Sequence, residues 1–248
     1  MKKFKVLITG CSSGLGLHLA NKFEKEGHFV FRHEGKKHFD LSKIEEVKHL
    51  SEEAKKLEID VLVNNAAMVC PSIVLEEYED DLIDSMIEVN LKAPIVLTKK
   101  LLPTLKNLIN INSMVGLEIK APRTLYSATK WGLRGFSNSL KKESNLSVLD
   151  VYPTNIKTTP DRVNAMDIDM VVDEIYSAFV EEKEENPKMN KPMEMATNEE
   201  KKEEQPEEIA EESGSEEPTE TAKAETESRT EQKEKIREAK ADARLVKT

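Results

Sequence analysis

The chain has 248 residues, a formal net charge of −10 and two cysteines, and this length fits one or two domains. The acidity is concentrated in 181–248, where 22 acidic and 13 basic residues leave about −1 for residues 1–180. A nearly neutral body gives no electrostatic footprint for nucleic acid. Cys11 and Cys70 form no CxxC pattern and no Cys/His cluster, so we expect neither a disulfide framework nor a metal site.

The sequence predicts neither a signal peptide nor a membrane span. The stretch MKKFKVLITG has a basic start, but its apolar run is short and meets Gly10 at once. No apolar run approaches the roughly 18 residues that suggest a transmembrane helix. We therefore expect a cytoplasmic protein with no membrane partner.

The carboxyl-terminal part, 181–248, has the composition of a disordered segment. It contains no aromatic residue and few large aliphatic ones, so it offers too little apolar surface to offset the entropy of ordering the chain. We predict a folded domain at 1–180 and a charged, disordered tail at 181–248. The tail serves either as a solvated spacer or as an acidic interaction segment, and its composition leaves both open.

Residues 1–180 alternate short apolar strands with amphipathic helices. Strands are predicted at 4–9, 28–33, 59–67, 108–113 and 146–153, and helices at 15–27, 44–57, 80–102, 125–143 and 168–182. Ser42 and Glu45 have the spacing of a capping box at the start of the second helix. The strands are continuous apolar runs, which predicts an α/β fold: a doubly wound parallel sheet with helices on both faces. Ligands bind such sheets at the carboxyl ends of the strands.

A glycine-rich turn, TGCSSGLG, joins the first strand to the first helix. Gly10, Gly14 and Gly16 let a ligand approach the backbone, and the helix start presents free N–H groups to an anion. Ser12 and Ser13 add hydroxyl groups. The spacing GxxxGxG differs from the general GxGxxG fingerprint, so the turn alone indicates either a phosphate-binding loop or merely a tight strand–helix connection.

The second strand ends in FRHEGKK, which bears on the choice of cofactor. An acidic side chain at this place would bind a ribose 2′-hydroxyl, whereas a basic one would meet a 2′-phosphate. Glu34 favours NAD, while Lys36 and Lys37 suit NADP. We expect NAD or NADP, with a slight preference for NAD.

The stretch YSATK places Tyr126 and Lys130 four residues apart, on one face of the predicted helix 125–143. A free tyrosine has a pKa near 10, and a nearby ammonium lowers it. Such a tyrosine could exchange a proton with a carbonyl or alcohol oxygen. Ser113 could donate to the same oxygen, and Asn90 could hold a water linked to Lys130. A Tyr-x-x-x-Lys pair is common by itself, so its companions decide its meaning.

The chain resembles the short-chain dehydrogenase/reductase family through seven motifs in the family's order. These are TGCSSGLG, FDLS, NNAA, VN, INS, YSATK and YPTNIKT, spread over roughly 4–180. The resemblance implies a Rossmann-type fold and a nicotinamide cofactor. It also implies that Asn90, Ser113, Tyr126 and Lys130 are catalytic, with Tyr126 and Lys130 touching the cofactor as well.

The same resemblance assigns further positions to the cofactor. Asp40 matches the residue that contacts the adenine, Asn64 and Ala66 lie beside the adenosine ribose, and Ile156 and Thr158 hold the nicotinamide carboxamide. The predicted cofactor-binding set is Gly10, Ser12, Ser13, Gly14, Leu15, Gly16, Glu34, Asp40, Leu41, Asn64, Ala66, Tyr126, Lys130, Pro153, Ile156 and Thr158.

Several features depart from that family. The connection between the second strand and FDLS apparently lacks a helix, and Thr154 stands where the family commonly has glycine. Few residues separate Thr158 from the last helix, where longer members carry a substrate-covering segment. The family's final strand has only a poor candidate, in MEMAT. Cys11 stands in the glycine turn where alanine is usual, either as a reactive thiol or as a passive small residue.

The complete catalytic set predicts an NAD(P)-dependent oxidoreductase that acts on a small carbonyl or alcohol substrate. The shortened substrate region and the long tail suggest an alternative, a cofactor-binding regulatory or scaffold protein with little catalysis. The resemblance also implies a homo-oligomer formed through the helices around 80–102 and 125–143.

Overall fold

The computed structural model describes residues 2–69, 72–157, 165–181 and 193–195. All of them belong to one compact unit, Met1–Glu204. Cys70, Thr158 and nearly all of the predicted tail lie outside the described residues. None of the described helices is both long and apolar enough to cross a membrane.

The sheet is parallel throughout and has the strand order β2-β1-β3-β4-β5-β6. Its strands are β1 (Lys5–Thr9), β2 (Phe29–His33), β3 (Val61–Asn64), β4 (Asn107–Ile111), β5 (Ser147–Pro153) and β6 (Met193–Met195). The predicted parallel α/β fold is confirmed. The chain order reverses between β1 and β3, so a ligand crevice is expected at their carboxyl ends.

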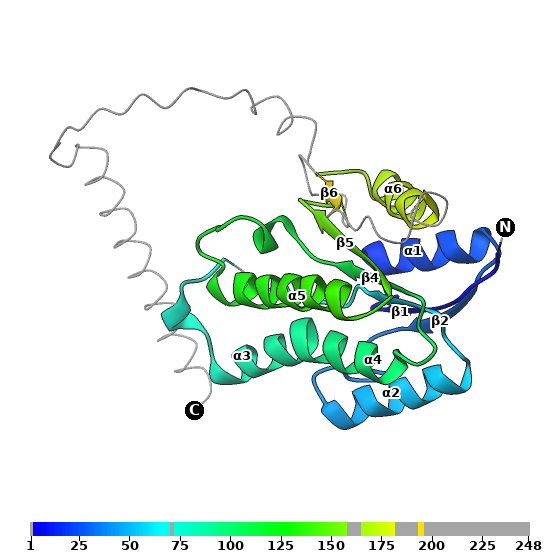
Figure 1. Cartoon of the computed structure of the whole chain (residues 1–248). Coiled ribbons are helices and arrows are strands. Elements are labelled where there is room, and N and C mark those ends of the chain that lie inside the picture. Colours follow the sequence, from blue (N-terminus) through cyan, green and yellow to red (C-terminus); the bar gives the residue numbers. More distant parts are fainter. Residues whose placement is uncertain (1, 70–71, 158–164, 182–192, 196–248) are drawn as a thin grey trace, which may run out of the picture. The chain divides into compact units, whose positions relative to one another are not determined.

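Helices cover both faces of this sheet (Figure 1). One face carries α1 (Gly14–Lys25) and α6 (Ile168–Glu181), and the other carries α2 (Ile44–Lys56), α4 (Ala93–Leu101) and α5 (Thr124–Glu143). The predicted helix 80–102 is divided into α3 (Asp80–Ile87), a π-helical turn η2 (Glu88–Lys92) and α4. Two short 3₁₀ turns, η1 (Leu75–Glu77) and η3 (Met114–Gly116), complete the described elements.

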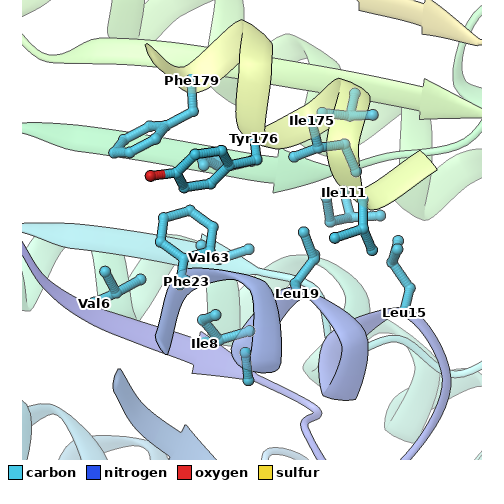
Figure 2. Packing of buried hydrophobic residues seen from close by; sticks show 14 of the residues in the cluster. Val6, Ile8, Leu15, Leu19, Phe23, Val63, Ile111, Ile175, Tyr176 and Phe179 are labelled. Atoms are coloured by element: carbon cyan, nitrogen blue, oxygen red, sulfur yellow. The ribbon is translucent and has the colours of Figure 1, made fainter. Parts of the chain in front are cut away.

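The core under α1 and α6 is built from alternate residues of the strands (Figure 2). Val6 and Ile8 of β1 and Val63 of β3 face Phe23 of α1 and Tyr176 of α6. The Phe23 and Tyr176 rings meet edge to face at 5.2 Å, a favoured aromatic geometry. The residue between the first two, Leu7, belongs to the opposite core with α2 and α4. The strands are therefore apolar at successive positions because both of their faces are buried.

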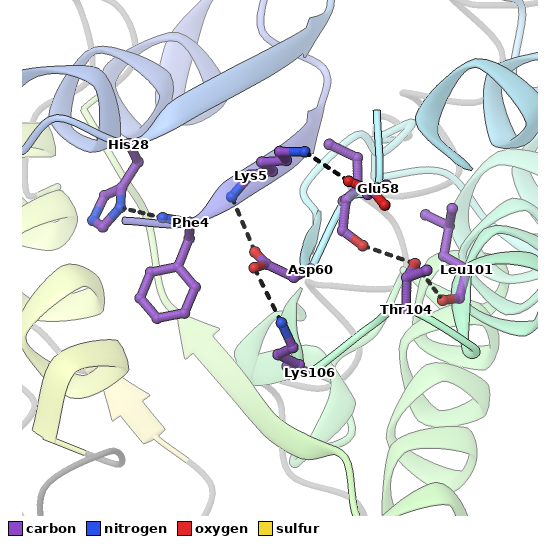
Figure 3. Close-up of polar contacts among 9 residues, drawn as sticks. Phe4, Lys5, His28, Glu58, Asp60, Leu101, Thr104 and Lys106 are labelled. Carbon is purple, nitrogen blue, oxygen red and sulfur yellow. Dashed lines mark hydrogen bonds and ion pairs between the residues drawn. The ribbon is translucent and has the colours of Figure 1, made fainter. Parts of the chain in front are cut away.

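Polar contacts align the amino-terminal ends of the strands (Figure 3). The Lys5 amide donates to Asp60 Oδ1 at 3.0 Å, and Lys106 Nζ lies 3.5 Å from the other carboxylate oxygen. Thr104 Oγ1 donates to the Ile59 carbonyl at 3.0 Å. The turns before β1, β3 and β4 are thus tied together.

A buried polar ladder crosses β3, β4 and β5 on the α5 side of the sheet. Asn64 Nδ2 donates to Asn110 Oδ1 at 2.9 Å, and Asn110 Nδ2 donates to Asp150 Oδ1 at 3.2 Å and to Ser137 Oγ of α5 at 2.9 Å. Lys141 Nζ of α5 lies 2.9 Å from Asp150 Oδ2, as an ion pair without hydrogen-bond geometry. These contacts attach α5 to the central strands.

Two expectations about local structure were wrong. Met193–Met195 of MEMAT, which we had considered a poor candidate for the final strand, pairs with β5 in parallel. Ser42 does not cap α2, which begins at Ile44; instead the Asp40 carboxylate accepts from the Ser42 amide and hydroxyl. The missing helix after β2 is confirmed, since only turns separate His33 from α2.

Removing Lys141 should destabilise the fold because Asp150, 1% exposed, would be left without a counter-charge. We expect Lys141→Met to lower the free energy of unfolding by about 3 kcal/mol, measured by urea denaturation. The neighbouring Lys142→Met, on the exposed side of α5, should change it by less than about 0.5 kcal/mol. Equal effects of the two variants would contradict this account, and Lys141→Met combined with Asp150→Asn should recover part of the loss.

Candidate active site

A cavity of about 440 Å³ opens at the carboxyl ends of β1 to β5. Thirteen of the predicted site residues line it: Gly10, Ser12, Ser13, Leu15, Gly16, Asp40, Leu41, Ala66, Ser113, Tyr126, Lys130, Pro153 and Ile156. Gly14, Glu34, Asn64 and Asn90 are not part of its wall, and Thr158 lies outside the described residues. Most residues proposed for cofactor and chemistry therefore surround one space, although they come from distant parts of the sequence.

The glycine turn at one end of the cavity has no room for larger residues. Gly10 has φ of 75° and Gly14 of 55°, a region that favours glycine. A Cβ on Gly16 would lie 2.1 Å from the Gly10 carbonyl oxygen. Ser13 precedes the first turn of α1, and both it and Ser12 are exposed. The turn thus presents a helix start and two hydroxyl groups at a surface free of side-chain bulk, which suits a phosphate group.

Cys11 is a passive part of this turn. Its thiol donates to the Ile8 carbonyl at 3.1 Å and is 1% exposed. Burial raises the pKa of Cys11 to about 12, so the reactive thiolate considered from the sequence does not form near neutral pH.

Three residues that the sequence did not single out hold the glycine turn in place. His33 Nδ1 accepts from the Gly10 amide at 3.1 Å, and its Nε2 lies 2.7 Å from the Phe39 carbonyl. Asn65 Nδ2 donates to the Thr9 and Gly10 carbonyls at 2.8 and 3.2 Å. Thr9 Oγ1 accepts from the Asn65 and Ala66 amides, both at 3.0 Å. All three act through backbone groups, so only their places at strand ends hinted at this role.

The cavity wall near Asp40 includes only one of the charged residues considered for cofactor choice. Lys36 is exposed and lines the cavity, whereas Glu34 is exposed outside its wall. Arg32 is engaged with α1, donating to both carboxylate oxygens of Glu24 at 2.8 and 2.6 Å. Burial raises the pKa of Asp40, but the two hydrogen bonds from Ser42 and the charge of Lys36 outweigh it and leave that pKa below its usual value.

Asn90 acts as a brace and lies behind the cavity wall. It occupies the π-helical turn η2, a geometry often found at functional sites. Its Oδ1 accepts from the Met68 amide at 2.7 Å, and its Nδ2 donates to the Met68 carbonyl at 2.9 Å and to Thr129 Oγ1 at 3.3 Å. Asn90 thus joins the loop after β3 to the helix that carries Tyr126.

Ser113, Tyr126 and Lys130 come together in the part of the cavity wall formed by the end of β4 and by α5. Lys130 Nζ donates to the Ile111 carbonyl at 2.9 Å and lies 5.7 Å from the centre of the Tyr126 ring. Asn112, another residue that sequence reasoning missed, accepts from the Ser113 amide and donates to the Lys130 carbonyl, at 3.0 and 3.2 Å. The end of β4 and the middle of α5 are thereby held as one unit.

Burial shifts the pKa values of Tyr126 and Lys130 in opposite directions. It raises the pKa of Tyr126, and the hydrogen bond with Ser113 and the charge of Arg123 offset only part of that rise. Burial lowers the pKa of Lys130 to about 8. The sequence had led us to expect a lowered tyrosine pKa; the structure gives the reverse because desolvation of the phenolate dominates.

Residue Ile156 of the cavity wall is bridged to a residue that follows soon after it in the chain. Ile156 and Met166 form a parallel bridge, with Lys157 N donating to the Met166 carbonyl at 2.9 Å and Met166 N donating to the Asn155 carbonyl at 2.8 Å. The chain therefore returns to the edge of the site soon after Pro153, in line with the shortened substrate region expected from the sequence.

Comparison with known proteins identifies the class to which this fold and site belong. The family model described as short chain dehydrogenase matches residues 5–167. The chain belongs to the short-chain dehydrogenase family, a family of oxidoreductases. An uncharacterized oxidoreductase of Staphylococcus aureus is 30% identical over 180 aligned positions, covering 61% of this chain and 78% of the relative. About 150 residues of this chain, which is 61% of 248, occupy the 180 aligned positions, so this chain is shorter than its relative within the matched part.

Solved structures share the fold. A short-chain dehydrogenase from Streptomyces avermitilis has a TM-score of 0.68 at 21% identity, covering 80% of this chain and 89% of that one. An alcohol dehydrogenase from the archaeon Thermococcus sibiricus, complexed with 5-hydroxy-NADP, has a TM-score of 0.67 at 21% identity, covering 84% and 100%.

The His33 contact predicts a pH effect on stability. Only a neutral imidazole can accept from the Gly10 amide, and burial lowers the pKa of His33 below its ordinary 6.5. The stabilisation is therefore complete above about pH 6.5 and is lost as the pH falls through the lower folded-state pKa. Between pH 7 and pH 5, we expect wild type to lose about 1 kcal/mol more unfolding free energy than His33→Gln, measured by urea denaturation. The other histidines are common to both proteins, so equal losses would refute this role of His33.

Proposed function

We propose that this chain is an NAD(P)-dependent oxidoreductase that interconverts a carbonyl and an alcohol, with Tyr126 as the general acid and base. The observation that carries the proposal is that Ser113, Tyr126 and Lys130 share one cavity with the glycine turn. Family membership supports the reaction class.

A dinucleotide fits the residues at the glycine turn. The cradle between Gly10 and Gly16 excludes a Cβ, and the start of α1 offers N–H groups to a pyrophosphate. Asp40, Leu41 and Ala66 form the wall on the adenine side, and Pro153 and Ile156 form it on the nicotinamide side. When bound, the nicotinamide supplies or accepts the hydride.

The protein's own groups handle the proton and the developing charge. Tyr126 gives a proton to the carbonyl oxygen during reduction and takes it back during oxidation. Ser113 donates a hydrogen bond to the same oxygen and stabilises the negative charge that develops on it. Lys130, with a pKa of about 8, is largely cationic at pH 7 and favours the phenolate that Tyr126 leaves after proton donation. Asn90 keeps this helix in register with the loop after β3.

Replacing Tyr126 by Phe should remove turnover but leave cofactor binding. We expect kcat to fall at least about 100-fold, while the NADPH dissociation constant changes by less than about twofold, measured by ketone reduction and by calorimetric titration. Tyr176→Phe, which removes a hydroxyl from the core under α6, is the matched control and should retain activity.

Normal turnover by Tyr126→Phe would refute the assignment. Cofactor binding by wild type without turnover of any aldehyde or ketone would instead support the regulatory or scaffold alternative, which the short Lys157–Met166 connection favours.

We further propose NADP as the preferred cofactor, reversing the slight preference for NAD drawn from Glu34. Lys36 lines the cavity together with Asp40, and Glu34 lies outside the wall. The complex of the Thermococcus sibiricus relative with 5-hydroxy-NADP agrees with this choice.

The preference can be tested at Lys36. We expect Lys36→Ala to weaken NADPH binding about tenfold, which is about 1.4 kcal/mol, and to leave NADH binding almost unchanged. Lys37→Ala, which removes an equally exposed charge outside the wall, should affect neither cofactor. Tighter binding of NADH than of NADPH by the wild type would overturn the proposal.

A further inference from the structure

Thr154 is a cavity residue whose hydroxyl group has no partner. It follows Pro153, the last residue of β5, and lines the cavity together with Ser113 and Tyr126. Its Oγ1 is shielded from water and makes no hydrogen bond within the part of the chain that the structure describes. An unsatisfied buried hydroxyl costs about 1–3 kcal/mol, so a hydroxyl kept here needs a function to explain it.

The place of Thr154 relative to the reacting oxygen follows from the register of the sheet. Ile111 of β4 pairs with Val151 of β5, and the Asn112 amide donates to the Val151 carbonyl at 2.8 Å. Continuing this register by two residues brings Ser113 opposite Pro153. Thr154, the next residue of the chain, is therefore expected close to the level of the proposed oxyanion donor.

A carbonyl oxygen has two lone pairs, and in the proposed function Ser113 and Tyr126 donate to both of them. A third hydroxyl at the same level then has no acceptor on that oxygen. Thr154 Oγ1 has no exposed surface in this structure, so binding a ligand requires a change to another staggered χ1 rotamer that turns the hydroxyl toward the cavity. The partner that suits it is a second oxygen on the substrate, next to the carbonyl carbon.

We propose that Thr154 is a specificity-determining residue that binds a second oxygen of the substrate, and that the preferred substrates are carbonyl compounds with a hydroxyl or oxo group on the adjacent carbon. This inference rests on the proposed function and narrows it to a substrate class.

The test pairs two ketones with two side chains. Hydroxyacetone and butan-2-one differ by a hydroxyl in place of a methyl, as do threonine and valine. With NADPH as cofactor, we expect Thr154→Val to lower kcat/KM for hydroxyacetone about tenfold and to change kcat/KM for butan-2-one by less than about twofold. Thr154→Ser, which keeps the hydroxyl, should preserve the wild-type preference.

The alternatives give different results. Equal effects of Thr154→Val on both ketones would overturn the inference and leave the proposed function intact. A weaker NADPH affinity with an unchanged ratio of kcat/KM would assign the hydroxyl to the cofactor and would also overturn it. If wild type binds NADPH but reduces neither ketone nor any other carbonyl compound, the proposed function and the inference both fail.

Discussion

The close approach of Gly16 to Gly10 is the constraint on which the site depends. A Cβ on Gly16 would lie 2.1 Å from the Gly10 carbonyl oxygen and 2.4 Å from Asn65 Nδ2. Because there is no side chain, α1 can start directly against the end of β1 and pack Leu19 into the sheet. Asn65 donates to the carbonyls of both Thr9 and Gly10, so the loop after β3 is fixed by the same contact. Because Gly16 has no side chain, β1, α1 and the loop after β3 can meet at the point where the strand order reverses.

The helix that carries Tyr126 and Lys130, α5, is fixed separately. Its distal half is attached to β4 and β5 by Ser137 and Lys141, through buried polar partners. Its middle is held by the Lys130 ammonium on the Ile111 carbonyl and by Asn112 on the Lys130 carbonyl. Polar groups buried this deeply are costly unless they are paired, and their pairing allows only one orientation of α5. The position of Tyr126 is thus set by contacts that extend well beyond the cavity.

Much of this arrangement follows from local sequence, and the rest depends on long-range backbone contacts. Val6 and Ile8 of β1 pack into one core and Leu7 packs into the other. Both faces of the strand are therefore buried, and the resulting apolar run made β1 predictable from the sequence. His33 has no such pattern, because its role is to meet a backbone amide 23 residues away in sequence. The strand Met193–Met195 was judged a poor candidate for a similar reason: pairing with β5 uses backbone groups, and three residues are too few to show a period.

Burial shifts the pKa values of Tyr126 and Lys130 in opposite directions, because tyrosine is charged when deprotonated and lysine when protonated. Burial removes water from the charged form of each group, so it raises the pKa of Tyr126 and lowers that of Lys130 to about 8. The phenol therefore remains protonated near neutral pH, while the ammonium stays close to its titration range. The hydrogen bond with Ser113 and the charge of Arg123 offset part of the rise in the pKa of Tyr126. The protein environment by itself thus favours the protonated form of Tyr126, which is the form that the proposed carbonyl reduction requires.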